Sequence, residues 1–239
     1  MGLALEHYIR SLDVREVPMY NLAEAARYLK MNQGRLRNWF VGYWYPTGSG
    51  ERRWADAVLK MADQDSRVLS FYDVASAHIV LGFRRKRVPL KVVRQAIQYY
   101  ITEIDPQRYP LLSEDFYSFG KDIIIEKMGE YISLGKHGQL AISKVVEKYL
   151  DRIERDPHTK LPVRFAPVFS PSLRGRDLII IDPNVCYGRP VIRGTRITAE
   201  FIYKRNRSGE RVSSLAKDYQ LSKRVIEEAI AYCSQRKAA

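Results

Sequence analysis

Residues 20–40 read YNLAEAARYLKMNQGRLRNWF, and the architecture of the N-terminal part of the chain follows from this stretch. Small and apolar residues recur at helical spacing from Leu22 to Leu29 and again from Leu36 to Phe40. Asn32 stands just before the second run, where its side-chain oxygen can accept a hydrogen bond from a backbone N–H of the first turn. Because only a short turn separates the runs, the stretch predicts a helix-turn-helix.

The residues that follow predict a small hairpin and then a further pair of helices. Residues 42–50 mix aromatic side chains with turn-forming Gly, Pro and Ser, and they lead into Arg52 and Arg53, which favours a hairpin wing. Helices are expected over about 71–83 and 90–101, with the basic run Arg84–Arg87 and Pro89 between them. Proline ends the first helix but is well placed at the start of the second.

The middle of the chain changes to a β-rich pattern. Residues 116–126 and 130–134 are short runs of β-forming residues, and turn material at 156–160 predicts a second hairpin. A helix is expected over about 139–149, and residues 167–175 are rich in Pro, Ser and Gly, as in a linker.

The last part of the chain predicts a hairpin followed by three helices. Gly194 lies between two short apolar pairs and favours a tight reversal, and helices are expected over 199–206, 212–219 and 223–234. The fold class is therefore α+β, mainly helical. The expected domains are a winged helix-turn-helix over 1–104, a β-rich middle segment over 105–170 and a hairpin plus helix-turn-helix domain over 171–239.

Charge is concentrated at the two ends of the chain. Lys and Arg number 40 against 27 Asp and Glu, for a net charge of +13. Residues 1–102 and 174–239 each carry +7, whereas residues 103–173 carry −1. Such an excess favours polyanionic partners, so we expect contact with nucleic acid.

The helix-turn-helix spacing occurs twice, and the outward-facing residues distinguish the two copies. Apolar and small residues at positions 26, 29, 31, 36 and 39 recur at 216, 219, 221, 226 and 229. In the first copy, polar side chains that suit base edges in a major groove project from the second helix. They are Gln33, Arg35, Arg37 and Asn38.

Two further pairs of cations are candidate DNA contacts. Arg52 and Arg53 on the wing can reach the backbone or the minor groove. In the second copy Lys223 and Arg224 are followed by the carboxylates of Glu227 and Glu228, which repel phosphate unless they point away. We therefore expect the first copy to read bases, and the second to contact phosphate or form an oligomer.

Other classes of protein find little support in the sequence. Only Cys186 and Cys233 are present, and the four histidines are not spaced as metal ligands, so we expect no metal, no cofactor and no enzymatic activity. No apolar run of about 18 residues exists, and the first ten residues lack a signal peptide's apolar region. The expected location is the cytoplasm.

Two parts of the sequence resemble known families. Asp182-Pro183 and the string Gly188-Arg-Pro-Val-Ile-Arg-Gly-Thr-Arg-Ile197 resemble domain of unknown function 433, found in VapB-like antitoxins. Residues 20–102 resemble the winged helix-turn-helix of the MerR type, in residues 20–29 and in Leu69-Ser-Phe-Tyr-Asp73. The combination is similar to two-domain VapB-like antitoxins of type II toxin-antitoxin systems.

That resemblance implies operator binding as a homodimer, autorepression of the operon and neutralisation of a PIN-domain ribonuclease toxin. The near-neutral middle segment is then the expected toxin surface. Two other functions remain open. One is a ligand-responsive MerR-like transcription regulator with a small molecule in its middle segment. The other is a metal-dependent nuclease that would use the carboxylates of Asp105, Glu114, Asp115 and Asp122.

Overall fold

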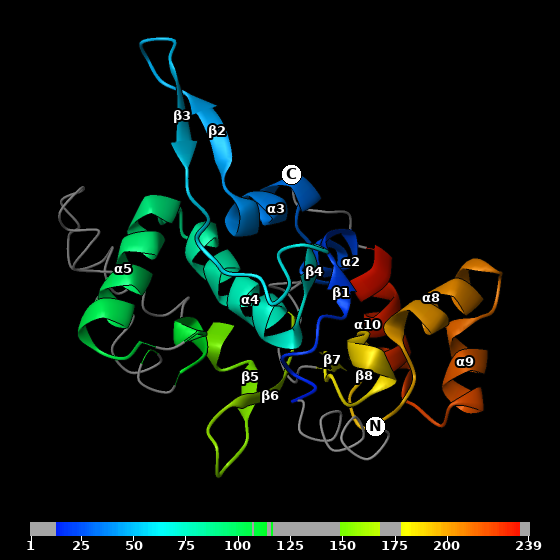
Figure 1. Ribbon diagram of the computed structural model, residues 1–239. Helices are drawn as coiled ribbons and strands as arrows, with labels where there is room; N and C mark the ends of the chain where they lie inside the picture. Colours follow the sequence, from blue (N-terminus) through cyan, green and yellow to red (C-terminus); the bar gives the residue numbers. More distant parts are fainter. Residues whose placement is uncertain (1–12, 107, 114–115, 117–148, 168–177, 235–239) are drawn as a thin grey trace, which may run out of the picture.

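The computed structural model describes residues 13–106, 108–113, 116, 149–167 and 178–234 (Figure 1). The N-terminal part contains short strands, helices and a 3-10 turn in the order β1 (Tyr20–Asn21), α2 (Leu22–Tyr28), α3 (Gln33–Val41), β2 (Tyr43–Pro46), β3 (Arg52–Ala55), β4 (Val68–Leu69), α4 (Phe71–Arg85), α5 (Leu90–Glu103) and η1 (Pro110–Leu112). The expected helix-turn-helix, wing and helix pair are confirmed.

Side-chain caps fix where the two helices of the helix-turn-helix begin. Asn21 caps α2 through a capping box: its Oδ1 accepts from the Glu24 N–H, and the Glu24 carboxylate accepts from the Asn21 N–H. Asn32 caps α3 in the predicted way, accepting from the Arg35 N–H at 3.2 Å. Lys30 adopts a left-handed φ of 56° between the two helices, and this reversal ends α2.

Helix α4 lies at the centre of the largest core. Ser70 and Asp73 form its capping box, and most of its side chains are buried, in contact with elements on several sides. The second predicted hairpin is also confirmed, as β5 (Ile153–Arg155) and β6 (Pro162–Phe165). Phe165 of β6 is fully buried, with its ring centroid 5.8 Å from that of Phe71.

One core thus joins residues that are far apart in the sequence. It includes Tyr20, Phe116, Phe165 and Ile181, which come from all three expected domains. The division at residues 104 and 170 stays a prediction.

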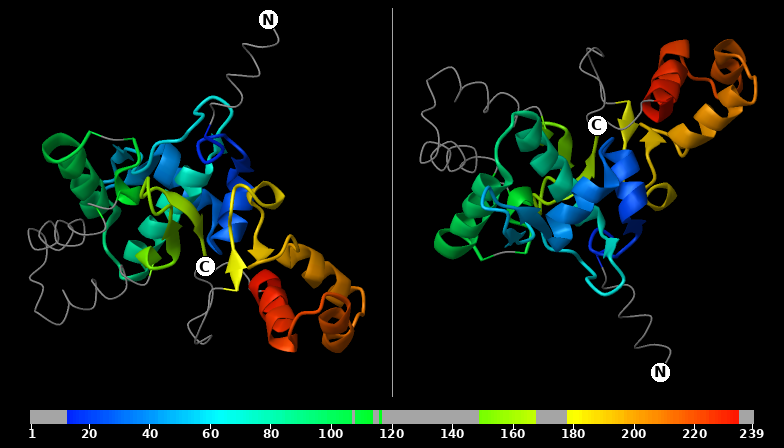
Figure 2. Two further views of the ribbon diagram at one scale, coloured as in Figure 1. Left: turned by 90° about the horizontal axis from the view of Figure 1, so that it is seen from below. Right: turned by 90° about the horizontal axis from the view of Figure 1, so that it is seen from above.

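The C-terminal part has its own smaller core. Its elements are β7 (Ile179–Ile180), η2 (Cys186–Gly188), β8 (Val191–Ile192), α8 (Ala199–Arg207), α9 (Val212–Asp218) and α10 (Lys223–Ser234). The three helices agree with the predicted ranges to within a residue. In both views of Figure 2 these helices lie on the opposite side of the molecule from α5.

The predicted hairpin at Gly194 is only part of the observed sheet. The chain does reverse there, because Gly194 has a φ of 77° and Val191 forms a single bridge with Thr198. The strand that pairs with β8, however, is β7, with Ile179 opposite Ile192. A strand of two residues carries too little pattern for its partner to be read from the sequence.

Several predictions fall outside the described residues. These are the β-rich runs beyond residue 116, the start of the helix expected from 139, most of the linker at 167–175 and the proposed nuclease carboxylates at 114, 115 and 122. The α+β class with an N-terminal helix-turn-helix is confirmed. No helix in the described ranges has the length and apolar character needed to cross a membrane.

Candidate nucleic-acid interface

Helix α3 separates an apolar face from a polar one. Leu36, Trp39 and Phe40 are buried in the main core, where α3 packs against α2. Ala25 and Ala26 on α2 are fully buried, and their small side chains let the two helices approach closely. The local sequence thus fixes which side of α3 faces solvent.

The polar face of α3 carries the predicted base-reading residues. Gln33, Arg35 and Arg37 are exposed, and Asn38 is half-buried on the same helix. Within the described chain, Arg37 takes part in no ion pair, so its guanidinium can form hydrogen bonds with a ligand. A major groove admits a helix of this kind, with arginine pairing to guanine and glutamine or asparagine to adenine.

The wing follows α3 directly. Gly42 ends the helix with a φ of 85°, and an added Cβ would lie 2.6 Å from both the Ala55 carbonyl oxygen and the Trp54 ring. The N–H groups of Val58 and Leu59 both donate to the Trp39 carbonyl, so the segment that follows β3 is joined to the last turn of α3. Figure 1 shows the β2–β3 hairpin standing out from the body of the molecule beyond α3.

The wing presents two cations and an aromatic pair. Arg53 lies opposite Tyr45 and Arg52 opposite Pro46, and both arginines are exposed, with no ion pair among the described residues. The Trp44 and Trp54 rings pack edge to face with centroids 5.5 Å apart. These indoles pack against one another across the hairpin and so support it.

The second helix-turn-helix presents its cations elsewhere. Lys223 and Arg224 are exposed at the first turn of α10, whereas Tyr232, near the other end of α10, contacts α2. Glu228 is buried and Glu227 is exposed, so only one of the two carboxylates faces solvent. The eight predicted residues therefore form three groups, on α3, on the wing and on α10. The structure joins the first two through Gly42 and keeps the third separate.

The described residues do not gather potential metal ligands in one place. They contain no cluster of three His, Cys, Asp or Glu side chains suited to a metal ion. His78 is fully buried between the rings of Tyr149 and Phe165, and burial lowers the pKa of its imidazole to about 3. His78 therefore packs in the core as a neutral imidazole.

Family models match both ends of the chain. Residues 18–97 match the model described as "Putative DNA-binding HTH domain", and residues 179–233 match "Protein of unknown function (DUF433)". A curated relative, "Putative antitoxin VapB45" of Mycobacterium tuberculosis (strain ATCC 25618 / H37Rv), is 26% identical, and the alignment covers 92% of this chain and 96% of the relative.

A solved structure has the same fold. The crystal structure of Rv2018 from Mycobacterium tuberculosis matches with a TM-score of 0.63 and 24% identity, over 90% of this chain and 98% of that one. The curated relative is named as a putative antitoxin, and the model that matches residues 18–97 is described as a DNA-binding domain. Over nearly its whole length the chain is similar to a putative VapB antitoxin, with an N-terminal helix-turn-helix domain and a C-terminal domain of unknown function 433, as the sequence motifs predicted.

Proposed function

We propose that the protein is an antitoxin that binds operator DNA through α3 and the wing and thereby represses its own operon. One observation carries the DNA-binding part. Helix α3 buries Leu36 and Trp39 while it exposes Gln33, Arg35 and Arg37, and Gly42 connects it to a wing with two exposed arginines. Amide and guanidinium groups form hydrogen bonds with base edges and phosphates, which supports the proposal.

The residues have different roles in this proposal. Gln33, Arg35, Arg37 and Asn38 read bases, and Arg52 and Arg53 contact the backbone beside them. Lys223 and Arg224 lie at the far end of α10, so they contact phosphate outside the half-site or take part in assembly. The chain acts as a homodimer, which requires an operator of two related half-sites.

The partner in the antitoxin role is a PIN-domain ribonuclease, and its neutralisation is the second part of the proposal. It is supported by the similarity to a putative VapB antitoxin over most of both chains.

Co-expression with the adjacent open reading frame tests the whole proposal. The two products are purified through a tag on one of them, and ribonuclease activity is measured before and after the complex is dissociated. We expect a stoichiometric complex with suppressed ribonuclease activity and specific binding to the DNA upstream of the operon. Recovery of the tagged chain alone, or a complex that still degrades RNA at the rate of the free toxin, would contradict the antitoxin role.

A further inference from the structure

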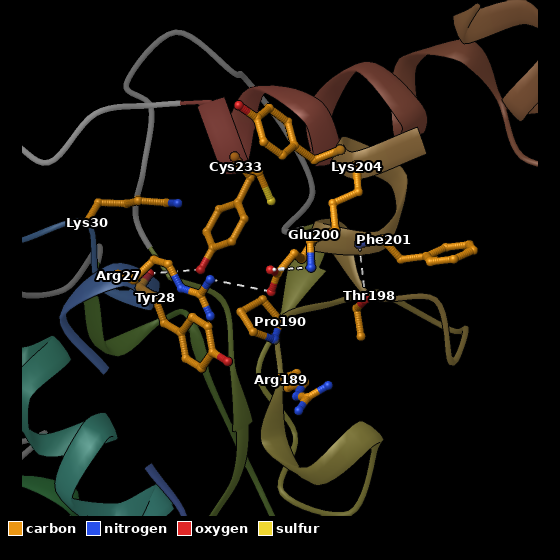
Figure 3. A pocket seen from close by; sticks show the side chains of 12 residues that line it. Arg27, Tyr28, Lys30, Arg189, Pro190, Thr198, Glu200, Phe201, Lys204 and Cys233 are labelled. Carbon is orange, nitrogen blue, oxygen red and sulfur yellow. Dashed lines mark hydrogen bonds and ion pairs between the residues drawn. The ribbon is translucent and has the colours of Figure 1, made fainter. Parts of the chain in front are cut away.

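A cavity of about 410 Å³ lies at the seam between α2 and the helices of the C-terminal part. Arg27, Tyr28 and Lys30 line it from the end of α2, and α8 and α10 supply most of the facing wall. Figure 3 shows Arg27 and Lys30 reaching toward Glu200 and Cys233 on these helices. Its volume lies in the range of sites for small molecules, which is about 300 to 1,000 Å³.

The lining is strongly cationic. Arg27, Lys30, Arg189 and Lys204 face one carboxylate, that of Glu200. Glu200 is already shared, with Arg27 at 3.5 Å and Lys204 at 3.1 Å. In the described part of the chain, neither Lys30 nor Arg189 forms an ion pair, so positive charge remains uncompensated inside the cavity.

Burial of the Lys30 ammonium in the cavity wall is unfavourable for the stability of the fold. Only 7% of Lys30 is exposed, and its Nζ lies 3.9 Å from the centroid of the Tyr232 ring, which provides some cation–π stabilisation. Burial lowers the pKa of the ammonium to about 8. The left-handed backbone at this position would suit glycine better than lysine. An observed combination of strain and buried charge motivates a functional hypothesis for this side chain.

The neighbouring thiol does not neutralise this charge. Burial raises the pKa of Cys233 to about 11, so near pH 7 the group beside Lys30 is a neutral thiol. The remaining walls are largely apolar and include Tyr28, Pro190, Phe201 and Tyr232. A ligand that fits both parts of the lining needs an acidic group and a flat apolar body.

We propose that this seam cavity binds a small organic anion, whose carboxylate or phosphate pairs with Lys30 and whose planar part lies along the tyrosine and proline walls. Arg189 adds attraction for the same charge from the C-terminal side. Lys30 precedes Asn32, the N-cap of α3, by two residues, so the ligand lies against the turn that positions the polar face of α3. This site differs from the middle segment, where the sequence alone placed a possible ligand.

Calorimetric titration of the full chain at pH 7 tests the site without DNA. The probes are phenyl phosphate, benzoate and the neutral benzyl alcohol. Comparison of the first two shows whether the site prefers a phosphate or a carboxylate group. We expect one-to-one saturable binding of at least one of the two acids and none of benzyl alcohol. Lys30→Met should weaken that binding at least about tenfold, whereas Lys217→Met on α9, outside the cavity, should leave it within about twofold.

A second variant keeps the test independent of effects on folding. Arg189 is exposed, so Arg189→Gln should unfold at the same temperature as the wild type and still bind the acid several-fold more weakly. The proposal is overturned if neither acid saturates the protein, or if both variants bind the acids as tightly as the wild type does. These readouts involve neither operator nor toxin, so their failure is distinct from failure of the antitoxin role.

Discussion

The hydroxyl of Tyr232 donates a hydrogen bond to the backbone carbonyl of Tyr28, 2.8 Å away and 204 residues earlier in the chain. Tyr28 is the last residue of α2, and the final carbonyls of a helix have no partner within that helix. The C-terminal part of the protein therefore satisfies the end of the first helix of the helix-turn-helix.

Removal of this hydroxyl tests how much the seam contributes to stability. Tyr232→Phe keeps the ring and leaves a buried carbonyl without its donor, so we expect the free energy of unfolding to fall by about 1 to 2 kcal/mol. Urea denaturation followed by circular dichroism measures the change. Tyr203→Phe, also in the cavity wall, is the matched control and should shift the midpoint little. Equal midpoints for Tyr232→Phe and the wild type would mean that the bond contributes no net stability.

Gly188 of η2 and Tyr20 of β1 make a second close contact between the N-terminal and C-terminal parts. A Cβ on Gly188 would lie 1.7 Å from the Tyr20 hydroxyl oxygen, and Tyr20 is buried. Gly188→Ala should therefore lower the Tm strongly, by overpacking in addition to backbone strain.

Gly194→Ala isolates the strain, because Gly194 also has a positive φ but has no atom within 4 Å of an added Cβ. We expect Gly188→Ala to cost at least about 2 kcal/mol more than Gly194→Ala. Adding Tyr20→Phe to Gly188→Ala should recover part of the loss. If the two single variants have the same Tm, the close contact of Gly188 with Tyr20 does not contribute to the stability of the fold.

The position of the wing depends on Gly42. Gly42→Ala places a methyl group 2.6 Å from the Ala55 carbonyl oxygen and from Trp54, which forces the hairpin to move relative to α3. If wing and helix bind one duplex together, operator affinity should fall roughly tenfold. Gly50→Ala at the wing tip has a comparable φ and open space, so it should bind nearly as the wild type does. Fluorescence anisotropy with labelled operator measures the affinity of both variants. Equal affinities would mean that the position of the wing does not matter for DNA binding.

Base reading by α3 predicts a loss that depends on the DNA sequence. Arg37→Ala should cost about 1 to 3 kcal/mol on the operator and much less on random DNA if the guanidinium reads a base. Arg207→Ala on α8 removes the same charge from another exposed position and should have a small effect on both DNAs. A uniform loss with Arg37→Ala would instead assign that side chain to phosphate.

Salt dependence measures how many phosphates the protein neutralises. If five to eight phosphates are contacted, log K should fall with log salt at a slope of about −4 to −7. Anisotropy titrations at several salt concentrations give the slope. A slope near zero would remove the electrostatic basis for the DNA proposal.

Local features of the fold could be predicted because their causes lie within a few residues. Asn32 caps α3 through an N–H three positions away, and the spacing of Leu36 and Trp39 alone sets the buried face. Gln33, Arg35 and Arg37 follow from the same helical period. Each of these inferences needs only neighbours in the sequence, and the structure agrees with each.

Contacts across the seam could not be predicted in this way. From the sequence alone, Lys30 is expected to be a solvated turn residue, but in the fold its ammonium lies over the Tyr232 ring. Arg27 likewise forms an ion pair with Glu200, which is 173 positions away in the chain. The pairing of β8 with β7 could not be predicted for a different reason, since strands of two residues carry too little periodicity to select a partner. The contacts across the seam form the cavity. The local sequence signal for this cavity is Lys30, a lysine in the turn after α2.

Acid should destabilise the protein through His78. Its imidazole is fully buried, with Nε2 3.3 Å from the Tyr149 carbonyl. Burial, together with the charges of Arg152 and Arg85, outweighs the hydrogen bond to Tyr149 and lowers the pKa from 6.5 to about 3. Between these values the unfolded chain holds a proton that the folded chain does not, so unfolding takes up protons and stability falls as the pH drops from about 6.5 toward 3. The limit is about 1.4 kcal/mol per pH unit.

The buried carboxyl of Asp73 acts in the opposite direction near pH 4, because burial raises its pKa, so the clearest window for His78 is about pH 6.5 to 5. His78→Gln does not titrate there and should show a nearly flat stability over that window in urea denaturation. His158→Gln removes an exposed histidine and should keep the wild-type slope. A wild-type slope in His78→Gln would mean that another group takes up the proton on unfolding, since the remaining acid sensitivity could not arise from the buried imidazole.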